Sequence, residues 1–440
     1  MIEKIKEAIK RIDEISKKKK ITVISHFDTD GITSAAIFSR ALQRWGKKFS
    51  LQITKGLEED YINKLPEDNL LIFLDLASGS LNYLANKKTE VIIFDHHEIP
   101  LGIEIPKNVL MVNPLLENSE QISGAGICYL FAKEISHDNK DLATLAVLGM
   151  VGDIHDQNIG KTYNEIIKDS ETIVKRGLLI YPSTRPINKT LEYSSQPYIP
   201  GVSGSYKGVL ELLKEANLSP ENGRYRAIYE LNEGEMSSLI TAIMLRCKNQ
   251  EEIEKMIGNL YLVRFQNKLE DARELSALIN ACSRMDHPYI SLGFCLGNKD
   301  FRQKAEKIYM EYKQNLVAAL KYIEEAEQIK GKNYFIINAK DKIKDTIIGT
   351  VTSIISRSPA YVDGTIFISL AYNNDKIKVS ARIKGNNSKN VREVLVKTIS
   401  SIGGEVGGHQ NAAGCLIARE KEEEFMNELK KTLEIEMIKV

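Results

Sequence analysis

Aspartate and histidine residues follow an apolar segment near the start of this 440-residue chain. Residues 21–34 read ITVISHFDTDGITS, so His26, Asp28 and Asp30 lie in a turn that Gly31 closes. An apolar helix pattern follows, which places the three ionisable groups where a strand passes into a helix. Such groups are costly to bury unless they are paired or bound to a metal. A solvated loop is the alternative for this segment alone, because short acidic turns are common.

Three further apolar runs also end in carboxylates or imidazoles. Asp75 lies near the end of LLIFLDLA. Asp95, His96 and His97 end VIIFDHH, and Asp153, His155 and Asp156 lie at the end of LATLAVLGMVGDIHD. The carboxyl ends of parallel strands meet along one edge of a sheet, where ligands bind in open α/β folds. Carboxylate and imidazole ligands together suit divalent metals, and their number here fits a two-metal site.

The elements that would position these residues alternate along residues 21–156. After an opening helix over 1–20, strands are expected at 21–25, 49–54, 70–75, 91–95 and 109–112. Helices are expected at 32–45, 57–64, 80–87, 124–136 and 141–151. This alternation predicts a doubly wound parallel sheet.

The remaining chain divides by its pattern into three parts. Residues 157–300 are mainly helical, and within them 181–205 are rich in Pro, Gly, Ser and Tyr and predict a long loop. Arg185 and the tyrosines of this loop could meet a nucleotide, although a plain solvated loop is the simpler interpretation. Residues 301–330 predict a charged connector helix, and 331–440 a second, mixed α/β domain.

A glycine-rich stretch, SIGGEVGGHQNAAG, occupies residues 401–414 of the last domain. Glycine lets the backbone approach a ligand closely, and exposed N–H groups can hold a phosphate. Upstream, Ser380 and Arg382 strengthen this interpretation. The alternatives are a core histidine at His409 and a surface ion pair at Arg382.

Composition narrows the class of protein. The net charge is +1, so any nucleic-acid contact must come from a local group of lysines and arginines. No apolar run approaches the length of a membrane span, and the charged N-terminal helix does not resemble a signal peptide, so we expect a cytoplasmic protein. The five cysteines form no CxxC pair and are expected to be buried free thiols, not zinc ligands.

The order of these motifs resembles that of the DHH phosphoesterase superfamily, specifically archaeal RecJ-like single-strand exonucleases with DHH and DHHA1 domains. The matching pieces are HFDTDG (26–31), Asp75, DHH (95–97), GDIHD (152–156) and GGHQNAAG (407–414). The resemblance implies a DHH catalytic core over 1–156, a helical extension over 157–300, a connector over 301–330 and a DHHA1 domain over 331–440.

The resemblance also implies a site for two Mn²⁺ ions, with Mg²⁺ as the alternative metal. One ion would be held by His26 and Asp28 and the other by Asp30, His96 and Asp153, with Asp75 between them. His97 would lie by the scissile phosphate, and Asp95 would orient the imidazoles. The bacterial form of the first motif usually has Asp where this chain has His26. His155 is expected to have an ordinary structural role.

In the DHHA1 domain, the resemblance assigns nucleotide binding to six residues: Ser380, Arg382, Gly407, Gly408, His409 and Asn411. The implied function is a Mn-dependent exonuclease that releases nucleoside 5′-monophosphates from single-stranded DNA or RNA in repair, replication or nucleic-acid turnover. The resemblance favours the 3′→5′ direction and allows replication or repair proteins as partners.

Three alternatives remain open. The first is a phosphoesterase for short oligonucleotides, pAp or cyclic dinucleotides, and the second is an inorganic pyrophosphatase. A pyrophosphatase would lack the GGHxxAAG stretch that this chain has. The third is a non-enzymatic replication scaffold of the Cdc45 kind, which would not need to retain a full set of metal ligands.

Overall fold

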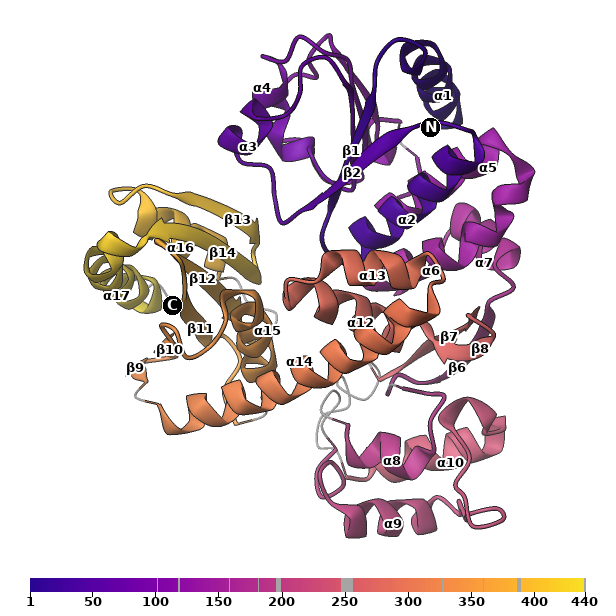
Figure 1. Cartoon of the computed structure of the whole chain (residues 1–440). Helices are drawn as coiled ribbons and strands as arrows, with labels where there is room; N and C mark the ends of the chain where they lie inside the picture. Colours follow the sequence, from indigo (N-terminus) through magenta and orange to yellow (C-terminus); the bar gives the residue numbers. More distant parts are fainter. Residues whose placement is uncertain are drawn as a thin grey trace. The chain divides into compact units, whose positions relative to one another are not determined.

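A computed structural model of the chain describes residues 1–100, 102–117, 119–157, 159–180, 182–194, 199–246, 256–326, 328–358, 360–385 and 389–438. The chain divides into two units, Met1–Glu306 and Lys307–Val440. Figure 1 shows the first unit in indigo to orange and the second in orange to yellow.

A five-stranded parallel sheet organises the first unit, in the order β2-β1-β3-β4-β5. Its strands are β1 (Ile21–His26), β2 (Phe49–Thr54), β3 (Leu70–Leu74), β4 (Val91–Phe94) and β5 (Val109–Val112). The expected strands and the doubly wound sheet are therefore confirmed.

Helices cover both faces of this sheet because its strands are apolar on both sides. One face packs against α3 (Glu59–Asn63) and α4 (Leu81–Leu84), with Ile24, Phe73 and Ile93 in the shared core. On the other side, the ring of Phe94 on β4 packs against Phe38 and Phe131. Phe38 belongs to α2 (Thr29–Arg44) and Phe131 to α5 (Gly124–Ile135). The remaining elements up to residue 157 are α1 (Ile2–Ser16), α6 (Ala143–Gly152) and the short 3₁₀ turns η1 (Ser78–Ser80), η2 (Pro114–Glu117), η3 (His137–Leu142) and η4 (His155–Gln157).

The rest of the first unit is helical around a small antiparallel sheet, β6-β7-β8, which the sequence pattern did not indicate. Its elements are α7 (Lys161–Asp169), β6 (Ile173–Leu178), α8 (Ile187–Glu192), α9 (Tyr206–Glu215), η5 (Ile228–Glu230), α10 (Glu233–Met244), β7 (Ile257–Phe265), β8 (Lys268–Asp271), α12 (Ala272–Arg284) and α13 (Pro288–Cys295). The expected loop over 181–205 is wrong in part, because α8 forms within it and buries Ile187 and Leu191. Arg185 pairs with Glu274, and Tyr181 and Tyr198 lie outside the described residues.

An ion-pair cluster joins the end of α7 to α5 and η3. Asp169 accepts a hydrogen bond from Tyr129 Oη at 2.7 Å and from Lys133 Nζ at 2.5 Å, and Lys140 Nζ lies 3.1 Å from its other oxygen. Burial alone would raise the pKa of Asp169, but the bonds from Lys133, Tyr129 and Lys140 lower it to about 2. The cluster therefore stabilises the fold only while this carboxylate is ionised.

We expect Asp169→Asn to lower the free energy of unfolding by about 1 kcal/mol at neutral pH, after allowance for solvent screening. The folded pKa lies below the unfolded value of about 3.9, so this contribution is complete above that pH and disappears as the pH falls toward 2. Denaturant unfolding of both proteins from pH 7 to 2 would measure the difference. Glu134→Gln, an exposed change on α5, is the control. A difference that is independent of pH would contradict the assignment.

The second unit is built on a six-stranded mixed sheet, in the order β13-β14-β12-β11-β10-β9. Only the β10–β11 pair is parallel. Its elements are β9 (Ile329–Gly331), β10 (Tyr334–Asn338), α15 (Asp345–Ser356), β11 (Ile366–Asn373), β12 (Lys376–Ile383), α16 (Val391–Ile399), β13 (Glu405–His409), β14 (Ala412–Ala418), η6 (Arg419–Lys421) and α17 (Glu422–Ile438). The long helix α14 (Lys299–Glu325) starts in the first unit and continues into the second.

The helices and the cysteines of the described residues bear on the expectations drawn from composition. In the described ranges, every helix is too short or too polar to cross a bilayer. Cys128, Cys282, Cys295 and Cys415 are buried free thiols, as predicted, whereas Cys247 lies outside the described residues.

Candidate metal centre and substrate-binding face

The turn between β1 and α2 is fixed by its own side chains. Asp28 caps α2 by accepting a hydrogen bond from Gly31 N at 3.0 Å, as Asp does at helix N-termini. His26 Nδ1 lies 3.0 Å from Asp28 Oδ2 and 3.7 Å from Asp75 Oδ2. A Cβ atom at residue 31 would lie 2.3 Å from His26 O, so only glycine allows the turn to be this tight.

The same turn is attached to a helix that is distant in the sequence. Thr29 N donates to Asn280 Oδ1 at 3.0 Å, and Thr29 Oγ1 donates to Ser276 O at 2.9 Å. Both partners belong to α12. The position of the His26–Asp28 turn therefore depends on a helix about 250 residues away.

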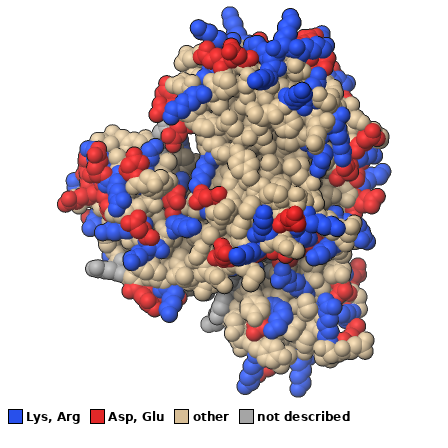
Figure 2. All heavy atoms as spheres, in the orientation of Figure 1, with Lys and Arg blue, Asp and Glu red and all other residues tan. Residues whose placement is uncertain are grey.

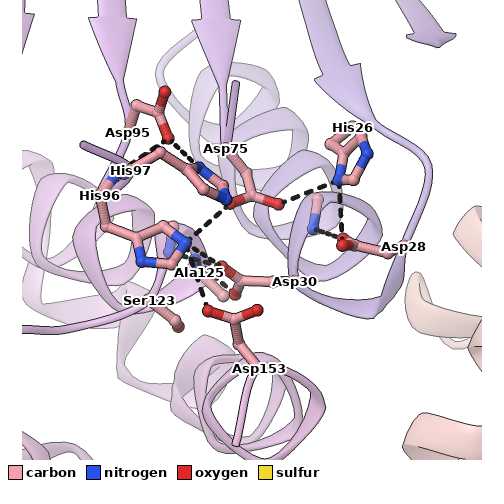
Figure 3. Close-up of polar contacts among 12 residues, drawn as sticks. His26, Asp28, Asp30, Asp75, Asp95, His96, His97, Ser123, Ala125 and Asp153 are labelled. Carbon is pink, nitrogen blue, oxygen red and sulfur yellow. Dashed lines mark hydrogen bonds and ion pairs between the residues drawn. The ribbon is translucent and has the colours of Figure 1, made fainter. Parts of the chain in front are cut away.

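Asp30 is held by the first turn of α5, whose Ala125 lies beside it in Figure 3. Gly124 N donates to Asp30 Oδ2 at 2.6 Å, and Ala125 N donates to Oδ1 at 2.9 Å. A helix N-terminus favours a negative charge at such a position. Burial nevertheless raises the pKa of Asp30, and the charges of Asp75 and Asp153 raise it further. Without a cation, this group of carboxylates is therefore electrostatically unfavourable.

His96 joins the carboxylates at the end of β4. Its Nε2 lies 3.2 Å from Asp75 Oδ1, 3.3 Å from Asp153 Oδ2 and 3.7 Å from Asp30 Oδ2 (Figure 3). Burial lowers the pKa of His96, but the bond to Asp75 and the three surrounding carboxylates raise it to about 10. The direction of this shift shows that the group of acids favours a positive charge at this position.

The predicted metal ligands His26, Asp28, Asp30, Asp75, His96 and Asp153 therefore converge at the carboxyl edge of the parallel sheet. At its centre, His26 Nδ1, His96 Nε2 and both carboxylate oxygens of Asp75 are buried. In the described part of the chain their contacts are ion pairs among the predicted ligands, without a hydrogen bond of regular geometry. Buried polar atoms that lack regular hydrogen bonds are costly, by up to roughly 1–3 kcal/mol each where no partner is present. Divalent cations bound by these nitrogen and oxygen atoms would remove that cost, so the residues present fit a metal centre.

His97 lies beside this centre and is more open to solvent. Its side chain is 54% exposed, and its Nδ1 lies 2.7 Å from Asp95 Oδ1. Asp95 is fully buried and also accepts hydrogen bonds from Ser78 N and Ser78 Oγ. The bond to Asp95 raises the pKa of His97, so its free Nε2 is presented as a proton donor.

Sequence reasoning did not single out three of these supports. Ser78 and the amides of Gly124 and Ala125 occur in segments without a recognisable motif, so no pattern could indicate them. His155 was expected to have an ordinary role, but its Nε2 lies 3.2 Å from Asp153 Oδ2, within a group of ligands that could hold a metal. Its proximity to Asp153 in the sequence was the available signal.

The predicted substrate-binding residues of the second unit share one face of its sheet. Arg382 and His409 both lie opposite Ala412, and Ser380 and Gly407 both lie opposite Gly414. Residues directly opposite each other project to the same face, so Arg382 and His409 point the same way about 10 Å apart. Asn411 lies in the turn that joins β13 to β14.

Among the predicted substrate-binding residues, Arg382 is held by a neighbouring helix, whereas His409 is exposed. Arg382 Nε donates to Ser353 Oγ on α15 at 2.8 Å. His409 is exposed, so the alternative of a core histidine is wrong. Gly408 has φ +109°, and a Cβ atom there would lie 2.4 Å from Ala412 O, which explains the glycine.

Lys378 is a further member of this face that the motifs did not indicate. It precedes Ser380 and Arg382 at two-residue spacing on β12, so the three side chains point to the same side. Lys378 Nζ lies 3.9 Å from where a Cβ atom of Gly414 would be. It forms no hydrogen bond or ion pair with a described residue, and burial lowers its pKa. An unpaired ammonium beside Ser380 and Arg382 makes this face suitable for an anion.

Three family models match the chain. The model described as "DHH family, N-terminal domain" matches residues 20–150, the "DHH-CID domain" 180–260 and the "DHHA1 domain" 306–435. Together they follow the order of the motifs described above.

Among proteins of similar sequence, an uncharacterised protein of Methanocaldococcus jannaschii is 28% identical, over 97% of both chains. The single-stranded-DNA-specific exonuclease RecJ of Thermus thermophilus is 30% identical over 34% of this chain and 25% of its own. The match thus spans a quarter of that exonuclease.

Solved structures resemble the whole fold. RecJ of Thermus thermophilus in complex with Mn²⁺ has a TM-score of 0.61 at 18% identity, over 97% of this chain and 54% of its own. A structure of the same protein has been solved in complex with Mg²⁺. CDC45 from Entamoeba histolytica has a TM-score of 0.64 at 14% identity, over 98% of this chain and 99% of its own.

Proposed function

Because the chain is a RecJ-like hydrolase of the DHH superfamily, we propose that it is a metal-dependent exonuclease on single-stranded DNA or RNA. It would release nucleoside 5′-monophosphates in the 3′→5′ direction during repair, replication or nucleic-acid turnover. One observation carries the proposal, namely the convergence of buried carboxylate and imidazole atoms, paired only with one another in the described part of the chain, beside the exposed His97.

The metal ligands of the proposal are the six converging residues. His26 and Asp28 would hold one Mn²⁺ or Mg²⁺ ion, and Asp30, His96 and Asp153 the other, with Asp75 contacting both. Two such cations, when bound, polarise the phosphate and activate water for in-line attack. The amides of Gly124 and Ala125 fix the rotamer of Asp30, so that this ligand is preorganised.

His97 would act on the scissile phosphate. Its Nδ1 faces Asp95, which leaves Nε2 free to hold a phosphate oxygen or to give a proton to the leaving oxygen. Asp95 in turn is held by Ser78 and fixes the orientation of the imidazole. Asp95 is therefore a positioning residue in this mechanism.

The surface charges are mixed (Figure 2), so we expect the substrate to be bound by a few specific side chains and not by a broad positive surface. On the face shown in Figure 2, lysine and arginine side chains are interspersed with acidic ones, as the net charge of +1 leads one to expect. In the second unit, we propose that Ser380, Arg382 and His409, with the backbone of Gly407 and Gly408 and the side chain of Asn411, bind a phosphate or the terminal nucleotide.

We expect Lys378→Ala to raise KM for a single strand about tenfold with little change in kcat, because a charge-assisted bond to a phosphate is worth roughly 1.5–3 kcal/mol. Steady-state digestion would measure both constants. Lys376→Ala, on the same strand, is the control. An unchanged KM would contradict a role of Lys378 in substrate binding.

The proposal is tested by digestion of single-stranded DNA and RNA labelled at either end, with Mn²⁺, with Mg²⁺ or with EDTA. We expect stepwise shortening from the 3′ end that requires a divalent cation. Parallel digestion of short and long strands, pAp, a cyclic dinucleotide and pyrophosphate would identify a small-substrate enzyme instead. If no substrate is hydrolysed, the nuclease proposal fails, and the fold shared with CDC45 would favour a scaffold in replication.

A further inference from the structure

A pocket lies in the first unit, away from the metal centre. It has a volume of about 430 Å³, within the usual range for small-molecule sites. The C-terminal half of α2, the start of α6, the β7–β8 turn and the end of α13 line it. Arg40 on this wall is ten residues beyond Asp30 on α2, or about 15 Å along the helix. Because α2 runs back from the carboxyl edge of the sheet, the pocket lies toward the opposite edge.

The charge of the pocket is positive. Arg40, Arg44, Arg264 and Lys299 line it, against a single acid, Asp141. Arg44 binds Asp141 through two hydrogen bonds of 2.7 Å, so this pair is neutral. Arg40, Arg264 and Lys299 form no ion pair with any described residue. Three uncompensated cations around one cavity indicate an anionic ligand, and guanidinium groups suit phosphate.

The turn between β7 and β8 supplies a polar group of another kind. Gln266 and Asn267 form a two-residue turn in which both φ angles are positive, +49° and +64°. Turns of this type normally contain Asn or Gly, so glutamine at the first position is unusual. Gln266 Nε2 donates to Phe294 O at 3.0 Å, which fixes the side chain. Its Oε1 is buried and has no hydrogen-bond partner in the described part of the chain.

A ligand that satisfies this pocket must combine three features. It must carry an anionic group for the three cations, a polar edge beside Gln266, which lines the pocket, and an apolar surface against side chains such as Leu145 and Phe265. A nucleoside monophosphate has all three, in its phosphate, the amino or imino group of its base and the face of the base. Inorganic phosphate has only the first.

We propose that this pocket binds a nucleoside monophosphate at a site separate from the metal centre. The inference does not depend on the proposed nuclease activity. The nucleotide contacts Arg264 and Lys299 through its phosphate and Gln266 through its base.

The test is a fluorescence titration of the full chain, in EDTA, with AMP that carries an N-methylanthraniloyl group on the ribose. The background would be Lys378→Ala with His409→Ala, so that the substrate-binding face of the second unit contributes little. We expect saturable binding at one site per chain, weakened about tenfold or more by Arg264→Ala with Lys299→Ala. Lys268→Ala with Lys304→Ala, which removes two exposed charges nearby, is the matched control and should change nothing.

A second variant separates base recognition from charge. Gln266→Gly relieves the left-handed backbone but also removes the amide and its bond to Phe294 O. Because these two effects on stability oppose each other, the thermal midpoint should change little, while AMP binding should weaken about fivefold. If both variants bind AMP as tightly as the background protein does, the proposal is wrong. If inorganic phosphate displaces the fluorescent AMP as well as unlabelled AMP does, the nucleotide assignment is wrong. If a thymidine oligonucleotide displaces it better than AMP does, and this effect is lost in Arg264→Ala with Lys299→Ala, the pocket binds a nucleic-acid strand instead.

Discussion

Asp75→Asn is expected to reduce hydrolysis by about three orders of magnitude, or roughly 4 kcal/mol in the transition state. The two buried oxygens of Asp75 face His26 and His96, one each, so its carboxylate charge would serve both proposed cations. Asparagine keeps its size and also tolerates the left-handed backbone of residue 75, whose φ is +58°. The variant therefore removes charge with little effect on the backbone.

The stability of this variant distinguishes a metal ligand from a structural acid. Without divalent cations, we expect its free energy of unfolding to stay within about 1 kcal/mol of wild type, because the lost contacts to the histidines are offset by reduced repulsion of Asp30. With Mn²⁺, wild type should gain thermal stability and the variant much less. Asp60→Asn, on the exposed surface of α3, is the control. Wild-type hydrolysis by Asp75→Asn would refute the proposed centre.

His97→Ala is expected to lower kcat about 10²–10³-fold, in the range found for proton donors. The side chain is half exposed and its main partner is Asp95, so truncation should not change folding of the sheet. The Mn²⁺-dependent rise in thermal midpoint should remain, because none of the proposed ligand atoms is lost. Steady-state kinetics and thermal unfolding of the same preparation would measure both.

Activity and the Mn²⁺-dependent thermal midpoint of His97→Ala together distinguish a proton donor from a metal ligand. If His97→Ala loses the stabilisation by Mn²⁺ together with activity, His97 is a metal ligand and the proposed role at the phosphate is wrong. His137→Ala, an exposed histidine at the start of η3, should match wild type in both measurements.

The sequence predicted the parallel sheet and the groups at its edge because apolar strands and terminal acids leave a direct local pattern. Five strands and the convergence of six residues follow from that pattern and from the family resemblance. Ser78 was not predictable, because its contact with Asp95 joins two segments without a shared motif. Lys378 was overlooked although its two-residue spacing from Ser380 was visible. The helix at Ile187–Glu192 was missed because tertiary burial of two apolar residues outweighs a polar, proline-rich context.

The hydrogen bonds from Thr29 to Asn280 and Ser276 have a consequence for dissection of this protein. A fragment that ends near residue 156 would retain every proposed metal ligand and nevertheless lack the helix that holds the first turn in place. Such a fragment should bind cations weakly even if its sheet folds. If α12 were exchanged for that of a relative, the position of the HFDTDG turn would change through the same contacts, although no residue of the turn itself is substituted. A fragment designed to keep the proposed metal centre intact should therefore extend to at least residue 284, the end of that helix.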